Sequence, residues 1–274
     1  MVGVARIELA TPAMSTQGLP PKAAEIRRFF VPRSRDESRT DPESRRILPR
    51  VYRAGDFGVR VLVACERSGV VRRAFERYGH DAWSCDLEPA DDRSNRHIRG
   101  NVLDHLDDGW DLLAVMHPPC TILCNSGVKW LYIGGKKANG PDPTRWAELE
   151  EAAAFYRALR DADQIPRRAI ENPVMHGHAI DLTRRGKVQF VQPWWFGDPF
   201  FKATGLELIG LAPLRPTDRL TPPKPGTEEH KAWSRVHREP PGPDRARRRS
   251  ETFPGMADAF ALQWGGDLVA RMAA

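Results

Sequence analysis

Blocks of apolar residues alternate along the chain with amphipathic stretches, and this alternation predicts strands separated by helices. The first apolar block, 59–65, is rich in β-branched residues and has the length of a strand. A turn at Ser68-Gly69 follows it and leads into apolar positions at helical spacing from Val71 to Tyr78. Further strands are predicted at 81–85, 97–102, 112–116, 168–170, 188–191 and 205–211, and further helices at 144–161 and 256–272.

The order of these elements, in which helices alternate with strands, is typical of a doubly wound α/β fold with a mostly parallel sheet. In such a sheet, ligands bind outside the carboxyl ends of the strands. The loops after the first, second, fourth and fifth predicted strands should therefore share one crevice. The polar residues of those loops are the candidates for a functional site.

The two ends of this pattern differ from its middle in composition. Residues 1–55 are rich in Arg, Pro, Ser and Glu and contain too few apolar residues to join a core, so we expect a disordered basic tail. Residues 56–274 then form the folded domain. Within that domain, the stretch of about 212–252 is rich in Pro and Arg, which predicts a small basic insert.

The charge and hydropathy of this chain of 274 residues indicate which kinds of partner it binds. Its formal net charge of +6 favours a polyanionic partner such as DNA, because clustered Lys and Arg release counterions from phosphates. No stretch approaches the roughly 18 consecutive apolar residues of a membrane span, and the first residues lack the pattern of a secretory signal. We therefore expect a cytoplasmic protein without membrane contact, and a monomer.

The four cysteines are too few and too unevenly spaced for a disulfide framework in a chain of this length. His117, Cys120 and Cys124 have a spacing that could bind zinc. The two prolines between His117 and Cys120 and the lack of a fourth ligand disfavour that interpretation. We expect no metal.

The first two strand ends carry residues suited to a nucleoside cofactor. The turn at Ser68-Gly69 could bring backbone amides and a helix N-terminus close to a polar group of the ligand. Asp86, about 20 residues further on, ends the second strand, where a carboxylate can accept hydrogen bonds from both hydroxyls of a ribose. Each feature also has an ordinary structural explanation as a turn or helix start.

The loop after the fourth strand reads H-P-P-C-T-I-L-C-N-S-G and holds Cys120 directly behind two prolines. Prolines fix the backbone, which suits the presentation of a nucleophile. A cysteine thiolate can add to C6 of a pyrimidine and make C5 nucleophilic. The alternative is an inert buried cysteine.

The next predicted strand ends at Glu171-Asn172-Pro173. A carboxyl group with a raised pKa at this position could donate a proton to N3 of the ring while Cys120 attacks C6. A glutamate in such a turn is otherwise an ordinary polar loop residue. Its place one strand after Cys120 favours the catalytic interpretation.

These residues together resemble the cytosine-C5 methyltransferase family over roughly residues 59–211. The segment F-E-R-Y-G-H-D-A-W-S-C-D is similar to the family's cofactor motifs, and Gly100-Asn101-Val102 is similar to its adenine motif. Pro118-Pro119-Cys120 with Ser126-Gly127 resembles the catalytic loop, and Glu171-Asn172-Pro173 resembles the Glu-Asn-Val motif. The chain is also similar to short phage-type proteins described as cytosine methyltransferases.

The resemblance implies a Rossmann-like fold dependent on S-adenosylmethionine, with a reduced target-recognition insert, and methyl transfer to C5 of cytosine in DNA. It assigns catalysis to Cys120, Glu171 and Asn172. Cofactor binding falls to Ser68, Gly69, Asp86, Asn101 and Pro118, and substrate binding to Ser126 and Lys202.

The sequence also departs from the family pattern. The first motif reads C-E-R-S-G, Asn101 stands where an Asp is usual, and His117 and Thr121 flank the cysteine in place of Gly and Gln. The Gln-x-Arg-x-Arg segment is missing, which leaves Lys202 as the nearest cation. An insert of about forty residues can make few base contacts, so we expect its arginines to contact phosphates.

Three other functions remain open from the sequence. The acceptor could be cytosine in RNA or in a free nucleotide. The enzyme could instead methylate an exocyclic amino group, although Cys120 and Glu171 argue against that chemistry. The protein could also be an inactive, DNA-binding relative.

Overall fold

The computed structural model describes residues 58–172, 174–242, 245–250 and 252–266. The expected tail at 1–55, Pro173, and the end of the last predicted helix lie outside the described residues. In the part that is described, no helix is both long enough and apolar enough to cross a membrane.

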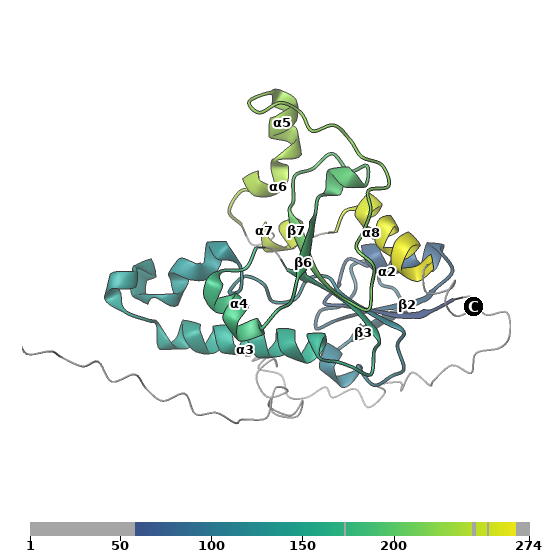
Figure 1. Ribbon diagram of the computed structural model, residues 1–274, viewed down its shortest axis with the longest axis horizontal. Coiled ribbons are helices and arrows are strands. Elements are labelled where there is room, and N and C mark those ends of the chain that lie inside the picture. Colours follow the sequence, from purple (N-terminus) through teal and green to yellow (C-terminus); the bar gives the residue numbers. More distant parts are fainter. Residues whose placement is uncertain (1–57, 173, 243–244, 251, 267–274) are drawn as a thin grey trace, which may run out of the picture.

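A seven-stranded sheet runs through the molecule in the order β3-β2-β1-β4-β5-β7-β6 (Figure 1). Its strands are β1 (Arg60–Ala64), β2 (Asp81–Asp86), β3 (His97–Arg99), β4 (Leu112–Val115), β5 (Arg167–Asn172), β6 (Val188–Val191) and β7 (Thr204–Ile209). β7 pairs antiparallel with β5 and with β6, and the other pairs are parallel. The predicted mostly parallel α/β sheet is therefore confirmed. Apart from the inserted β7, the order is that of the dinucleotide-binding fold, whose ligands bind where the order reverses, between β1 and β4.

Helices cover both faces of this sheet. The α-helices are α2 (Val70–Arg77), α3 (Pro143–Arg160), α4 (Gly177–Thr183), α5 (Glu228–Trp233), α6 (Arg235–Arg238), α7 (Arg245–Ser250) and α8 (Pro254–Phe260). Shorter helical turns are η1 (Val102–Asp104), η2 (Asn125–Leu131), η3 (Ile133–Gly135), η4 (Lys137–Asn139), η5 (Pro193–Trp195) and η6 (Ala261–Gly265). Side chains of α3 join the core on one face, and side chains of α2, α8 and η6 join the core on the other.

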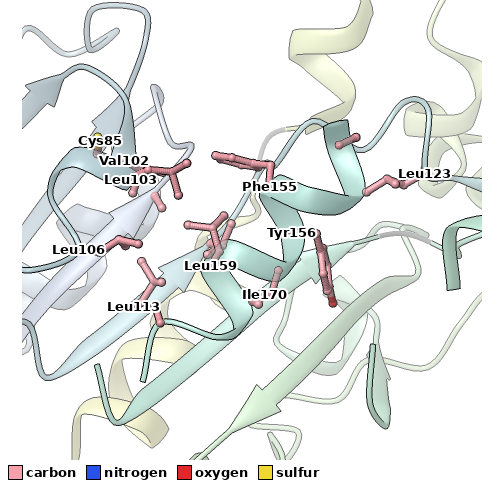
Figure 2. Packing of buried hydrophobic residues seen from close by; sticks show 14 of the residues in the cluster. Cys85, Val102, Leu103, Leu106, Leu113, Leu123, Phe155, Tyr156, Leu159 and Ile170 are labelled. Carbon is pink, nitrogen blue, oxygen red and sulfur yellow. The ribbon is translucent and has the colours of Figure 1, made fainter. Parts of the chain in front are cut away.

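β4 is apolar at every position, and β1 is apolar at every position after Arg60, because both faces of these strands are buried. Val115 and Ile170 pack on the α3 side, whereas their neighbours Ala114 and Ala169 pack on the α2 side. Figure 2 shows Phe155 reaching from α3 toward the η1 segment. The core thus holds the strand ends, and the loops that leave them, in fixed positions.

Two predicted boundaries are corrected by the structure. The strand expected at 97–102 ends at Arg99, and η1 begins at Val102, because the Asn101 side chain caps that turn by accepting from the Leu103 amide. Glu171 and Asn172 are the last residues of β5 rather than a turn. They remain in the strand because they pair with Leu206 and Gly205 of β7.

The register of β4 and β5 brings the loops after them together. Val115 is opposite Ile170, so the loop that begins at His117 leaves the sheet beside the end of β5. The Asn125 amide donates to the Val174 carbonyl at 2.8 Å. These contacts tie the loop that carries Cys120 to the segment that follows Asn172.

Candidate active site

A cavity of about 160 Å³ opens at the carboxyl ends of the parallel strands. The loops after β1 to β4 and helix α3 contribute to its lining Cys65, Asp86, Asn101, His117, Pro119 and Phe155. This is the crevice that the strand order predicts. It is smaller than the roughly 300–1,000 Å³ of a typical ligand pocket, so a ligand of nucleoside size would extend beyond it along the strand ends.

Asp86 and Asn101 meet in this cavity, as the sequence predicts. An Asp86 carboxylate oxygen accepts from the Glu88 amide at 3.0 Å, which holds the side chain at the end of β2. The Asn101 amide oxygen accepts from the Leu103 amide at 3.1 Å. Since an amide oxygen has two lone pairs, one remains for a ligand, and the amide nitrogen can donate.

The N-terminus of α2 is capped by an acid that the sequence analysis missed. Buried Glu66 accepts from the amides of Val71 at 2.6 Å and Arg72 at 3.1 Å, and from the Ser68 hydroxyl at 3.3 Å. The chain's own carboxylate therefore takes the anion position at this helix end. Burial raises the pKa of Glu66.

Three of the residues predicted to bind the cofactor take other positions. Ser68, Gly69 and Pro118 are not in the lining of the cavity formed by the described residues. Gly69 has a φ of 67°, a left-handed conformation that starts α2. Pro118 is buried beneath the loop, while Pro119 reaches the cavity.

Cys120 begins the turn after the two prolines. Its carbonyl accepts from the amides of Leu123 at 3.0 Å and Cys124 at 2.9 Å, and these bonds close the backbone around it. Burial, then the nearby Glu171 carboxylate, then Cys124 raise the pKa of the Cys120 thiol to about 12. Lys202 acts in the opposite direction. The thiol is therefore protonated at neutral pH.

Glu171 lies in the same electrostatic environment and is only 8 % exposed. Burial raises its pKa to about 7, although the Lys202 ammonium lowers it. The carboxyl group is thus divided between its two protonation states near neutral pH. A group of this kind can both donate and accept a proton.

His117 is the second residue that the sequence analysis did not assign to the site. Burial and the positive charge of Lys202 lower its pKa to about 3, so the imidazole is neutral. Its Nε2 is 3.4 Å from the Thr252 hydroxyl, and its side chain lines the cavity. His117 therefore connects the cavity to the surroundings of Cys120. Its place directly before Pro118-Pro119-Cys120 was the available signal.

Lys202 is held in place from two sides. Its backbone amide donates to the Gln192 side chain at 3.0 Å, and its ammonium donates to the Ser250 carbonyl at 3.0 Å. Ser250 ends α7, so the basic insert reaches the centre of the site through this bond. The positive charge of Lys202 therefore acts to lower the pKa of three side chains: Cys120, Glu171 and His117.

Asn172 is buried, and among the residues that the structure describes, neither its amide nitrogen nor its amide oxygen has a hydrogen-bond partner. An unpaired buried amide is costly, which makes Asn172 a candidate for contact with a polar ligand. Ser126 is exposed, and its hydroxyl is 3.0 Å from the Cys124 sulfur. Within the described ranges, no three His, Cys, Asp or Glu side chains group as metal ligands.

The insert packs on the chain around Lys202. The Phe201 amide donates to the Trp233 carbonyl at 2.9 Å, and the Arg235 guanidinium lies 4.1 Å from the centre of the Phe200 ring. Arg248 pairs with Glu239 at 2.7 Å. Some of the arginines expected to contact phosphates are thus engaged within the protein.

No protein-family model matches the chain, and no curated protein does. Several solved structures resemble it in part, and two of them are methyltransferases. The first is described as a DNA modification methyltransferase encoded within an E. coli prophage, with a TM-score of 0.36 and 14% identity, over 60% of this chain and 52% of that one. The second is the Entamoeba histolytica methyltransferase EhMeth, with a TM-score of 0.35 and 16% identity, over 61% of this chain and 57% of that one. The matched part spans little more than half of either protein.

Proposed function

We propose that this protein transfers a methyl group from S-adenosylmethionine to C5 of cytosine in DNA through a covalent adduct with Cys120. The observation that carries the proposal is that Cys120, in the loop after β4, lies near enough to Glu171 of the adjacent β5 for the carboxylate charge to act on the thiol, beside a cavity that contains Asp86. A nucleophile, a proton donor and a nucleoside site thus share one edge of the sheet.

The cavity residues fit S-adenosylmethionine, which supplies the electrophilic methyl group when bound. Asp86 can accept hydrogen bonds from the ribose hydroxyls, and Asn101 can contact the adenine. Apolar surface from Val102 and Phe155 lines the same space. Ser68, Gly69 and Pro118 lie outside the lining of the cavity, and their contact with the part of the cofactor that extends beyond it stays a prediction.

Cys120 must release its proton to water before it can attack, because its pKa lies near 12. The Lys202 ammonium favours the thiolate, and a protonated Glu171 removes the negative charge that opposes it. The thiolate sulfur then bonds to C6 of cytosine. The ring electrons move toward C5 and N3, and Glu171 delivers its proton to N3.

The remaining steps restore the aromatic ring. Bound S-adenosylmethionine would supply the methyl group to C5 by cleavage of its own sulfur–methyl bond. N3 then returns its proton to Glu171, the proton on C5 leaves to water, and Cys120 departs from C6 as a thiolate while the C5–C6 double bond re-forms. Asn172 offers a donor and an acceptor for polar atoms of the base. Ser126 at the rim and Lys202 beside Glu171 provide further substrate contacts.

DNA is the proposed acceptor because the chain is basic and its insert carries arginines next to the site. Incubation with labelled S-adenosylmethionine and four acceptors tests this: duplex DNA, single-stranded DNA, tRNA and deoxycytidine monophosphate. We expect label at C5 of cytosine in DNA. Label on an exocyclic amino group would contradict the proposed C5 chemistry, and label on RNA alone would contradict DNA as the acceptor.

A further inference from the structure

A loop of the molecule projects beside the site and has its own chemistry. Residues 125–140, called the projecting loop here, comprise η2, η3 and η4, and appear in teal at the left of Figure 1. Helices α5 and α6 of the basic insert lie at the top of the same view, away from the projecting loop. Nothing in the proposed chemistry uses the tip of the projecting loop.

The base of the projecting loop is anchored to the catalytic strands. Cys124 forms a β-bridge with Met175, and the Asn125 amide donates to the Val174 carbonyl at 2.8 Å. At its other end, Tyr132 bridges to Pro141. Any ligand of the tip is therefore held at a fixed position relative to Cys120 and Glu171.

The tip exposes large apolar side chains that would ordinarily be buried. Trp130 is 51 % exposed and Ile133 is 49 % exposed. Gly134 and Gly135 have φ values of 64° and 72°, which only glycine adopts without strain. A Cβ at Gly135 would lie 3.3 Å from the Trp130 ring, so this glycine also lets the indole settle against the backbone.

The charge of the projecting loop is entirely positive. It contains Lys129, Lys136 and Lys137 and no acidic residue. All three lysines are exposed, and within the described part of the chain none of them forms an ion pair. The Lys129 ammonium lies 4.6 Å from the centre of the Trp130 ring. An exposed indole among unpaired ammonium groups is complementary to a base with its phosphates.

We infer that the projecting loop is a nucleic-acid contact in which a base stacks on Trp130 while Lys136 and Lys137 bind the flanking phosphates. This inference rests on the proposed function, since it deepens the account of how DNA reaches Cys120. An indole accepts any base on its face, so the contact holds the strand without reading its sequence. Lys129 can move from the ring to a phosphate when a base takes its place.

The test measures binding of fluorescein-labelled DNA to the full chain by anisotropy, as duplex and as single strand, between 50 and 300 mM salt. Trp130→Ala should weaken binding about 5- to 150-fold, with the larger loss on the single strand, and Trp130→Phe should retain most of the affinity. Lys136→Gln and Lys137→Gln should each reduce the salt slope by about 0.9 on duplex.

Matched controls are Tyr78→Ala, an aromatic residue 44 % exposed after α2, and Lys187→Gln before β6, at the opposite end of the strands. Both controls should bind DNA like the unchanged protein. Normal DNA affinity in Trp130→Ala, together with an unchanged salt slope in Lys136→Gln and Lys137→Gln, would overturn the inference. So would a loop effect on self-association alone, because the tip would then bind a second copy.

Methyl transfer is measured on the same proteins, so that the two proposals fail separately. Loop-dependent DNA binding without any methyl transfer would reject the proposed function and leave the projecting loop as a nucleic-acid contact. If the protein methylates DNA but the loop variants bind DNA like the unchanged protein, the inference about the projecting loop is rejected and the proposed function stands.

Discussion

Burial raises the pKa of an acid in each half of the site, but the two halves differ in how their buried groups are hydrogen-bonded. On the cavity side, buried Glu66 accepts two backbone amides, and Asp86 and Asn101 each accept one. On the cysteine side, burial is not matched by such bonds. The pKa of Cys120 rises to about 12 and that of Glu171 to about 7, while the Asn172 amide has no partner.

This difference separates a binding half from a reacting half. Groups whose hydrogen bonds are complete stabilise the fold and offer a fixed surface to a ligand. Groups that are buried without partners destabilise the fold but have protonation states that can change during a reaction. In the proposed reaction, the cysteine side would supply the reacting groups, and the cavity side would position the cofactor.

The largest effect is expected at the nucleophile. Cys120→Ala should lower methyl transfer by about four orders of magnitude or more, because it removes the proposed bond to C6. The measurement is transfer of labelled methyl to DNA under single-turnover conditions. Cys124→Ala is the control and should stay active. Full activity in Cys120→Ala would remove the distinction between the two halves.

On the cavity side, Asp86→Ala should weaken binding of S-adenosylmethionine about 10- to 150-fold. The reason is the loss of a charged hydrogen-bond acceptor, which costs roughly 1.5–3 kcal/mol. Calorimetry measures the change, and Glu88→Ala, two residues further and exposed, serves as the control. Unchanged affinity in Asp86→Ala would mean that the cavity does not hold the ribose.

The pH dependence of stability sharpens the comparison through Glu171. Its pKa rises from 4.5 to about 7, so its contribution to stability is complete below pH 4.5 and is lost as the pH rises through 7. Glu171→Gln should therefore stabilise the protein at pH 8 by about 1–3 kcal/mol relative to pH 4.5, while slowing adduct formation. The pKa of His117 is lowered from 6.5 to about 3, so its contribution to the stability of the protein has the opposite pH dependence and is lost as the pH falls below 6.5.

Thermal unfolding is measured at both pH values for the Glu171→Gln variant and for the unchanged protein. Because His117 is present in both proteins, the difference between them isolates the contribution of Glu171 to stability. A gain of about 3–9 °C at pH 8 is expected for a domain of this size. An equal difference in melting temperature between the two proteins at both pH values would show that ionisation of Glu171 does not destabilise the fold.

The smallest effect is expected in the insert, which belongs to neither half. Arg249→Gln should reduce the salt slope of DNA binding by up to about 0.9, since its guanidinium is exposed. Arg248→Gln should reduce it less, because Arg248 already pairs with Glu239. Equal changes in the two variants would show that DNA displaces the internal partner.

The sequence predicted those parts of the site that depend on strand order alone. Parallel strands in a doubly wound sheet end at one edge, which was enough to bring Asp86 to Asn101 and the loop of Cys120 to Glu171. The apolar runs of β1 and β4 located the central strands, because burial on both faces removes polar positions.

What escaped the sequence depends on contacts between distant segments. Glu171 remains in a strand only because β7 pairs with it from more than thirty residues away along the chain. The position of Lys202 is set by Ser250, and no local pattern encodes that bond. Glu66 was overlooked because Ser68, two residues later, is the more usual type of helix cap.

Mass spectrometry of the protein after reaction with S-adenosylmethionine and DNA that contains 5-fluorocytosine tests the central claim most directly. Fluorine at C5 cannot leave as a cation, so elimination should stall after Cys120 has bonded to C6 and the methyl group has moved. We expect a stable adduct on the peptide that contains Cys120, absent in Cys120→Ala and retained in Cys124→Ala. Methyl transfer without any adduct, or an adduct on another residue, would contradict the account.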